Sequence, residues 1–167
     1  MYYSDVFRHP IFLRKSDHML TITRCTGKDE AFRALVTELD EELDERYGAQ
    51  MDFFGQYNHS SDIETALVAL LDGDLAGCGC FKLYSENTVE IKRIFVPKRF
   101  RGMGVARAIM AELESWAREL GYEFAILETG ILQPEAIRLY ERAGYARIPN
   151  YPPYENVSES VSYRKSL

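Results

Sequence analysis

The sequence has no long apolar run. No stretch of the 167 residues approaches the roughly 20 consecutive apolar residues that span a bilayer. Residues 1–20 carry charges, two histidines and Pro10 among their apolar residues, so they lack the continuous hydrophobic segment of a secretory signal. These two absences argue against a membrane-spanning or secreted protein, and the chain is predicted to be cytoplasmic.

Cysteine is sparse, with only Cys25, Cys78 and Cys80 in the whole sequence. An odd and small number of cysteines argues against a disulfide framework and favours reduced thiols in a cytoplasm. Cys78 and Cys80 form a lone C-x-C pair, which is a poor metal site without a second pair. We therefore expect buried, small hydrophobic residues and no metal.

Basic residues are fewer than acidic ones. The net charge is −6 and the isoelectric point is near 5.2, which argues against a nucleic-acid partner. Hydrophobic residues at 46% and charged residues at 28% are the usual mixture of a globular protein of one domain. The basic residues of 98–101 are thus a local feature, which favours a small anionic ligand over a polyanion.

The stretch 90–120 combines a strand, a basic loop and a helix. Its first residues are apolar and β-prone, and Pro97 ends the strand because proline cannot continue a central strand. A basic loop with Gly102 and Gly104 follows, and apolar residues then recur at helical spacing. A glycine loop at a helix N-terminus exposes N–H groups and partial positive charge, so the stretch is predicted to hold a phosphorylated cofactor.

Apolar and amphipathic segments follow one another in the rest of the chain. Strands are predicted at 20–24, 65–71, 75–84, from 88, at 124–127, at 145–148 and at 157–164, and further helices at 29–47 and 134–143. Three consecutive antiparallel strands therefore lead into the loop. Residues 1–19 keep no period and are taken as an N-terminal extension of uncertain structure, while 20–167 form a single domain without linker or repeat.

Two features leave alternatives open. Residues 49–61 are polar and aromatic without a period, and they either cover core surface or form a lid over the substrate. The predicted helix 29–47 has one acidic face, which is interpreted as solvated surface, with a cation-attracting rim as the weaker option.

Two motifs resemble the GNAT N-acetyltransferase superfamily. Residues 99–104, Arg-Phe-Arg-Gly-Met-Gly, match the family pattern Gln/Arg-x-x-Gly-x-Gly/Ala at a strand–helix junction. Residues 133–145 resemble the downstream Asn-x-x-Ala-x-x-x-Tyr helix followed by Gly-Phe/Tyr, with Gln133 where many members have Asn. The resemblance implies an α+β fold. Its central sheet would be mixed, mostly antiparallel and six- to seven-stranded, flanked by helices and splayed between the fourth and fifth strands.

The resemblance also implies acetyl-coenzyme A as the donor. The N–H groups of 101–106 would cradle its pyrophosphate with charge from Arg99 and Arg101, and the main chain of 94–96 would pair with the pantetheine arm. The Gln133 amide would bind the same arm. The residues assigned to the cofactor are Ile94, Phe95, Val96, Arg99, Arg101, Gly102, Met103, Gly104, Val105, Ala106, Gln133 and Tyr140.

Acetyl transfer from a thioester needs a neutral amine, a stabilised oxyanion and a protonated thiolate. Tyr140 matches the family tyrosine near the coenzyme A sulfur and is the candidate general acid; a core tyrosine is the alternative. Glu90 is the candidate general base, because partial burial would raise its pKa. The alternative for Glu90 is an exposed edge carboxylate paired with Lys92. Glu128 and His59 are reserve candidates.

The acceptor is expected to be a primary amine of a small molecule, an amino acid or a peptide, acetylated directly in a ternary complex. Its site is assigned to Phe54, Tyr57, Arg93, Glu128 and Tyr151. Arg93 would bind a substrate carboxylate or pair with Glu128. Exposed aromatic residues at both termini are compatible with a homodimer.

Other classes fit the sequence less well. The Gly-x-x-x-x-Gly-Lys-Ser/Thr motif of P-loop hydrolases is absent, and a dinucleotide-binding Gly-x-Gly-x-x-Gly would follow the first strand of a βαβ unit, whereas this loop follows a β-meander. The alternative that remains is a catalytically weak acyl-CoA-binding sensor or interaction module with the same fold.

Overall fold

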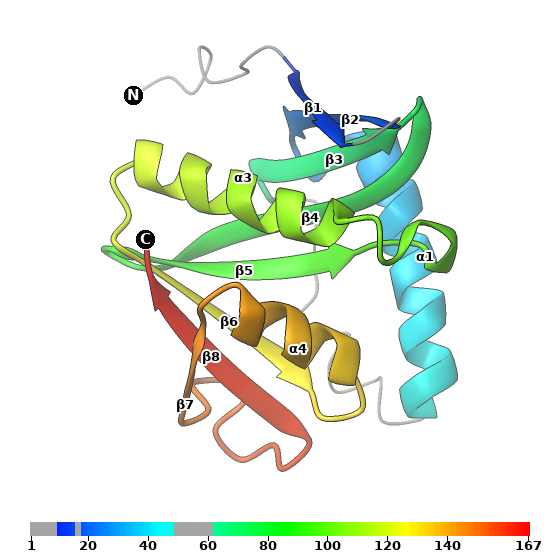
Figure 1. Ribbon diagram of the computed structural model, residues 1–167. Helices are drawn as coiled ribbons and strands as arrows, with labels where there is room; N and C mark the ends of the chain where they lie inside the picture. The colour runs from blue at the N-terminus through cyan, green and yellow to red at the C-terminus, as the bar shows by residue number, and fades with distance from the viewer. Residues whose placement is uncertain (1–9, 16–17, 49–61) are drawn as a thin grey trace. The chain divides into compact units, whose positions relative to one another are not determined.

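The computed structural model describes residues 10–15, 18–48 and 62–167 (Figure 1). Its elements are β1 (Ile11–Lys15), β2 (His18–Cys25), α1 (Glu30–Tyr47), β3 (Thr65–Leu71), β4 (Asp74–Ser85), β5 (Thr88–Phe95), the 3-10 turn η3 (Lys98–Phe100), α3 (Val105–Glu119), β6 (Phe124–Gly130), α4 (Pro134–Arg142), β7 (Ala146–Ile148) and β8 (Ser160–Ser166). The chain divides into two compact units. The first unit is Met1–Cys80 with Arg93–Ile109, and the second unit is Phe81–Lys92 with Met110–Leu167.

The described strands form an eight-stranded sheet in the order β1-β2-β3-β4-β5-β6-β8-β7. Strands β5 and β6 pair in parallel from Thr88–Phe124 to Glu90–Ile126, whereas β2 pairs antiparallel with β1 and β3, and β8 antiparallel with β6 and β7. The predicted α+β class with a mixed, mostly antiparallel sheet is confirmed. The sheet exceeds the six to seven strands expected because β1, in the segment without a clear period, pairs with β2. The splay between β5 and β6 stays a prediction.

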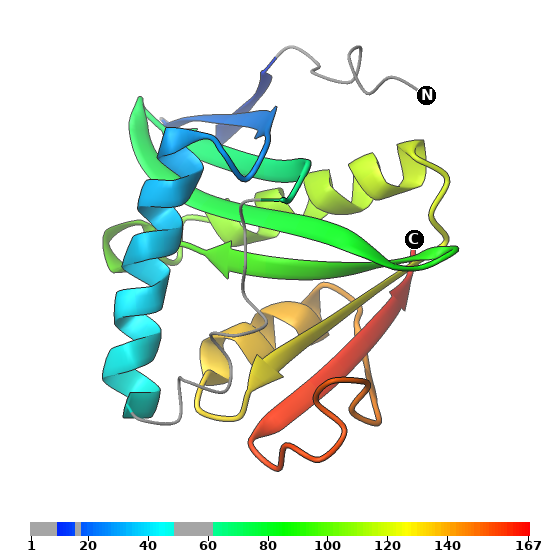
Figure 2. The same cartoon turned by 180° about the vertical axis from the view of Figure 1, so that it is seen from behind.

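Helix α1 begins at a side-chain cap. The Asp29 carboxylate accepts hydrogen bonds from the N–H groups of Ala31 and Phe32, at 2.9 and 3.1 Å. These bonds satisfy two of the N–H groups that have no acceptor within the first turn of the helix. Figure 2 shows α1 on the near side of the strands of the first unit. Its buried side chains recur at helical spacing: Phe32, Leu35, Val36, Leu39 and Tyr47.

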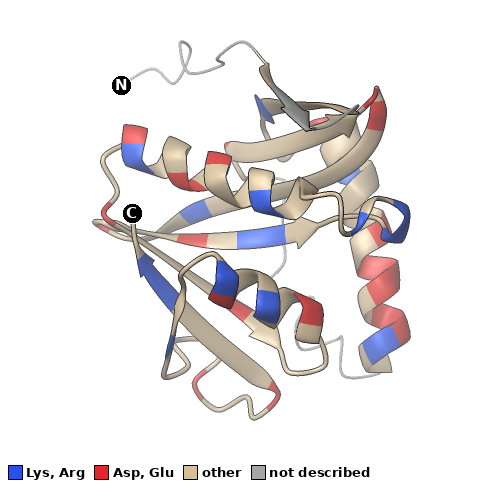
Figure 3. Ribbon diagram, viewed as in Figure 1, with Lys and Arg blue, Asp and Glu red and all other residues tan. Residues whose placement is uncertain are grey.

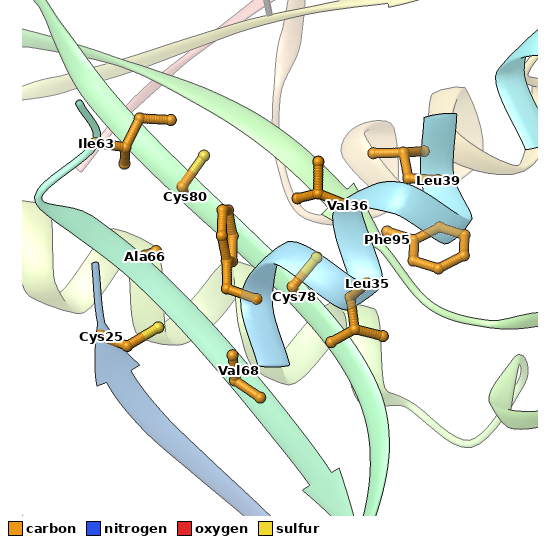
Figure 4. Close-up of a cluster of buried hydrophobic side chains, with 11 residues drawn as sticks. Cys25, Leu35, Val36, Leu39, Ile63, Ala66, Val68, Cys78, Cys80 and Phe95 are labelled. Atoms are coloured by element: carbon orange, nitrogen blue, oxygen red, sulfur yellow. The ribbon is translucent and has the colours of Figure 1, made fainter. Parts of the chain in front are cut away.

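The first unit has a core beneath α1. Figure 4 shows Leu35, Val36 and Leu39 directed at side chains from the neighbouring strands, Cys78 and Cys80 among them. All three cysteines of the sequence are buried in this cluster, and the burial of Cys78 and Cys80 was predicted. Burial raises the pKa of the Cys25 thiol to about 12. Burial also raises the pKa of Cys78 well above its ordinary value, so neither thiol is a thiolate at neutral pH.

The second unit is built on the antiparallel pair β6 and β8, which α4 covers (Figure 1). The ring of Tyr140, on α4, packs at a tilt against the ring of Tyr163 of β8 and edge to face against the ring of Tyr145, with ring centroids 6.4 and 6.3 Å apart. Trp116 of α3 meets Phe81 edge to face at 5.6 Å. Among the described residues, no helix has the length and apolar character that a membrane span needs.

Candidate functional site

The loop between β5 and α3 has the backbone that a close-fitting anion site needs. After Pro97 and the turn η3, Gly102 and Gly104 adopt left-handed φ values of 79° and 83°, a region that glycine enters without strain. Helix α3 begins at Val105, and the Ala108 N–H donates to the Gly104 carbonyl at 3.2 Å. The first turn of a helix leaves N–H groups without intrahelical partners, so this end of α3 can donate to a phosphate.

The Arg101 guanidinium is bound to protein groups on one edge. Its Nε donates to the Val96 carbonyl at 2.9 Å, and its Nη2 donates to both Glu42 carboxylate oxygens at 2.9 and 2.7 Å. Glu42 belongs to α1. Figure 3 shows the basic residues of the segment between β5 and α3 beside the acidic residues of α1. Part of the acidic face of α1 therefore binds the basic loop between β5 and α3, whereas the sequence pattern indicated solvated surface.

Two further arginines contact the same helix. Arg93, whose backbone is left-handed at φ 59°, forms an ion pair with Asp40, and its side chain is only 7% exposed. Arg99 lies more loosely, 3.9 Å from Glu38. Arg93 thus has Asp40 as an ion-pair partner, which was not among the partners predicted for it.

Glu90 is a buried carboxylate at the centre of a network of hydrogen bonds and ion pairs in the second unit. The residue is 4% exposed, and its carboxylate accepts a hydrogen bond from the Tyr151 hydroxyl at 3.1 Å. The Nζ atoms of Lys82 and Lys92 lie 3.4 and 3.5 Å from its two oxygens. Lys92 also donates to the Tyr154 hydroxyl at 3.1 Å. The pairing with Lys92 is present, but Glu90 is not the exposed edge carboxylate of the alternative interpretation.

Glu128 lies on β6 and has fewer hydrogen-bond and ion-pair partners than Glu90. Its carboxylate accepts a hydrogen bond from the Ser160 hydroxyl of β8. Burial raises the pKa of Glu128 to about 7, the Ser160 hydrogen bond and the Lys92 charge oppose the rise, and the Glu90 charge adds to it. This carboxyl group therefore exchanges its proton near neutral pH, which is the property of a general base at that pH.

Tyr140 is 7% exposed on α4. Burial raises the pKa of its phenol above the ordinary value, and the charge of Glu128 raises it further, so the hydroxyl keeps its proton at neutral pH. Gln133 precedes the same helix and is half-buried, and its side chain makes no capping hydrogen bond to the helix start.

The structure groups the predicted residues in two sets. Glu90, Glu128, Tyr140, Tyr151 and Gln133 belong to the second unit. Arg93 and the cofactor residues from Ile94 to Ala106 belong to the first. Phe54, Tyr57 and the reserve base His59 lie outside the described residues.

The residues that contact the assigned site residues but are missing from the sequence-based assignment include Asp40, Glu42, Lys82 and Ser160. Lys82 precedes Glu90 by eight residues across a turn, so the expected β4–β5 hairpin was a signal for their proximity. Ser160 reaches Glu128 through the β6–β8 register, in which Gly130 pairs with Ser160 and Glu128 with Ser162. That register and the Glu42–Arg101 contact depend on long-range packing, for which the local sequence has no signal.

Three features together indicate an acyl-CoA-dependent acyltransferase. They are the mixed sheet, the glycine loop that opens α3, and a carboxyl group with a pKa near neutrality in the same unit as a buried tyrosine. A family model described as the acetyltransferase (GNAT) family matches residues 29–145. The chain belongs to this family, as the sequence motifs predicted, and is an N-acetyltransferase with acetyl-CoA as its cosubstrate.

Relatives and solved structures agree with this membership. An IAA acetyltransferase of Azospirillum brasilense is 33% identical over an alignment of 156 residues, and the alignment covers 89% of this chain and 98% of the relative. The crystal structure of a candidate acyl-CoA N-acyltransferase of Klebsiella pneumoniae is 31% identical, with a TM-score of 0.73 over 89% of this chain and 97% of that one. A candidate streptothricin acetyltransferase of Bacillus anthracis, solved with acetyl coenzyme A, shares the fold at 23% identity, with a TM-score of 0.55 over 62% of each chain.

Proposed function

We propose that this enzyme transfers the acetyl group of acetyl-CoA directly to a primary amine of a small molecule, an amino acid or a peptide while both substrates are bound. The observation that carries the proposal is Glu128, whose pKa is about 7 in the unit that also holds Tyr140. An alkylammonium has a pKa near 10, so its deprotonation needs a base that is ionised at neutral pH. The protonated thiols of Cys25 and Cys78 agree with a route without a covalent enzyme intermediate.

In this proposal the N–H groups of 101–106 hold the pyrophosphate of acetyl-CoA, with charge from Arg99. The left-handed Gly102 and Gly104 support that placement, because residues without a side chain let a phosphate approach the backbone N–H groups closely. The main chain of 94–96 pairs with the pantetheine arm, and the amide of Gln133, which does not cap its own helix, binds the same arm.

Glu128 takes a proton from the acceptor ammonium, directly or through water, and the neutral amine attacks the thioester carbonyl carbon. The tetrahedral intermediate then collapses and the carbon–sulfur bond breaks. Tyr140, as general acid, gives its hydroxyl proton to the departing sulfur, and the remaining extra proton of the amine nitrogen passes to the Tyr140 oxygen through water, so that coenzyme A leaves as the thiol. We assign the base to Glu128 in place of Glu90, because Tyr151, Lys82 and Lys92 already surround the Glu90 oxygens.

The acceptor is proposed to bind near Tyr151, with Phe54 and Tyr57 as further aromatic contacts. Tyr151, Tyr154 and Tyr84 form an edge-to-face cluster, with centroid separations of 5.7 and 5.2 Å from the Tyr151 ring. Such a cluster suits the alkyl chain or the ring of an amine. Arg93 is a weaker acceptor contact than the sequence suggested, since Asp40 already neutralises it.

The test is release of free thiol from acetyl-CoA in the presence of an amine panel of polyamines, amino acids and peptides. IAA is included because the Azospirillum relative carries that name. We expect release with at least one acceptor, and Tyr140→Phe should lower kcat about 10- to 100-fold with an unchanged KM for acetyl-CoA. Tyr145→Phe, a change in the neighbouring buried tyrosine, is the matched control. Acetyl-CoA binding without release for any acceptor would indicate the acyl-CoA sensor instead.

A cytoplasmic location and a homodimer stay predictions. The sparse and unbridged cysteines support a reducing compartment. Sedimentation of the purified chain would distinguish a 19.2 kDa monomer from its dimer.

A further inference from the structure

Helix α1 is held by arginines on both sides of its apolar stripe. Residues 38 and 42 are about one turn apart, whereas residue 40 lies about 200° around the helix from residue 38. The buried Leu35 and Leu39 lie between these two positions. Arg99 and Arg101 therefore contact one flank of α1, and Arg93 contacts the other.

Of these three acidic residues of α1, Glu42 accepts the most side-chain hydrogen bonds, two from Arg101 and one from Arg46. Its carboxylate receives Arg101 Nη2 at 2.7 Å and Arg46 Nη2, from one turn further along α1, also at 2.7 Å. The Glu42 side chain is only 14% exposed. A carboxylate that is largely withdrawn from water loses much if one of its charged partners leaves, because the remaining charge is then poorly compensated.

The other bond of Arg101 reaches the end of β5. Nε and Nη2 form one edge of the planar guanidinium, and they bind the Val96 carbonyl and Glu42 at the same time. Arg101 thus connects three points of the first unit: the last residue before Pro97, the start of the glycine loop, and α1. For this edge to reach a phosphate, Arg101 would have to abandon both Val96 and Glu42.

We propose that Arg101 is a positioning residue, which Glu42 holds in place so that it fixes the Val96 carbonyl and the start of the loop for acetyl-CoA. Arg101 then supports the cofactor site without binding a phosphate. The inference rests on the proposed placement of acetyl-CoA along residues 94–106. It gives Glu42, which contacts no cofactor in this scheme, a role in the affinity for acetyl-CoA.

The experiment measures kcat and KM for acetyl-CoA, and its dissociation constant by calorimetry, in Glu42→Gln, Arg101→Gln and the double variant. Each single change should raise KM and the dissociation constant about tenfold with kcat nearly unchanged, and the double variant should match either single one, because both remove the same connection. If Arg101 instead binds a phosphate, Arg101→Gln weakens binding, whereas Glu42→Gln leaves it unchanged or tightens it. That outcome overturns the proposal.

Arg101→Lys separates charge from geometry. Lysine keeps the positive charge but cannot bind the Val96 carbonyl and both Glu42 oxygens through one planar edge, so we expect it to resemble Arg101→Gln. Full retention of acetyl-CoA affinity in Arg101→Lys would contradict the proposal.

Two controls accompany these variants. Glu45→Gln changes an exposed carboxylate of the same helix and should leave KM unchanged, and thermal unfolding without cofactor records any loss of folding. Gly104→Val tests the cofactor placement itself. If it leaves acetyl-CoA affinity intact, the placement and the inference both fail. If Gly104→Val weakens binding and Glu42→Gln does not, only the inference fails.

Discussion

Glu90 and Glu128 are two carboxylates of the second unit whose neighbours give them different roles. Each carboxylate oxygen offers two lone-pair sites, and the Glu90 oxygens already have Tyr151, Lys82 and Lys92 as donors. Glu128 accepts from Ser160 and titrates near neutral pH because burial disfavours its charge. A fixed ion-pair network suits Glu90 to hold Tyr151 in place, whereas a carboxyl group with a near-neutral pKa suits Glu128 to move a proton.

The first prediction concerns the pH dependence of catalysis. The base must be ionised, so kcat/KM for the amine should fall as pH decreases through about 7, where Glu128 becomes protonated. Glu128→Gln should lower kcat about 100-fold and remove this acidic limb. A stopped assay of thiol release from pH 5.5 to 9 measures both. A Glu128→Gln enzyme that kept the limb near pH 7 would show that another group titrates.

The packing of strand β4 against the end of β5 and the start of α3 depends on the absence of a side chain at Gly77. A Cβ at this position would lie 2.8 Å from the Phe95 carbonyl oxygen and 2.9 Å from Ile109 Cδ1, which is closer than atoms normally approach. Gly77 therefore lets the end of β5 and the first turns of α3 pack closely against β4. Glycine inside this strand therefore marks a close approach of neighbouring atoms.

We predict that Gly77→Ala destabilises the protein by about 1–3 kcal/mol, because overpacking forces backbone or side chains to shift. Since Phe95 and its neighbours are proposed to pair with the pantetheine arm, KM for acetyl-CoA should rise as well. Thermal unfolding and steady-state kinetics measure the two effects. An unchanged unfolding midpoint would mean that Phe95 and Ile109 move aside without cost.

Helices and strands were largely predictable from the sequence. The Asp72–Gly73 turn, the glycine loop before α3 and the end of α1 at Gly48 depend on local residue types, and the structure confirms them. The last strand differs, because it spans Ser160–Ser166 whereas 157–164 was expected. Its limits follow from pairing with β6 across more than 30 residues of chain, and the local pattern does not contain that information.

At the scale of the whole molecule, ligand binding should raise the free energy of unfolding. Acetyl-CoA at 100 times its dissociation constant adds about 2.7 kcal/mol if it binds only the folded chain. For a protein of this size we expect a rise in the unfolding midpoint of roughly 5–10 °C. A thermal-shift titration with acetyl-CoA, with adenosine as the control ligand, measures the effect. The absence of a shift would contradict the proposed cofactor site.

The family and fold were also predictable, because residues 99–104 and 133–145 are short motifs in the correct order of elements. The partners of the candidate site residues were less predictable from the sequence. Asp40 holds Arg93, Glu42 holds Arg101, and Ser160 holds Glu128, and each contact joins segments more than 30 residues apart. The pKa of Glu128 follows from such contacts and from burial, and neither is a property of the local sequence.

The three cysteines under α1 have one more consequence. Every thiol of the chain lies in a single buried cluster, so an alkylating reagent can modify the protein only when that cluster opens to solvent. The labelling rate therefore measures how often α1 separates from β2, β3 and β4, without any engineered probe. If acetyl-CoA stabilises the loop to which α1 is bound, the native thiols become a direct reporter of cofactor binding through their slower modification.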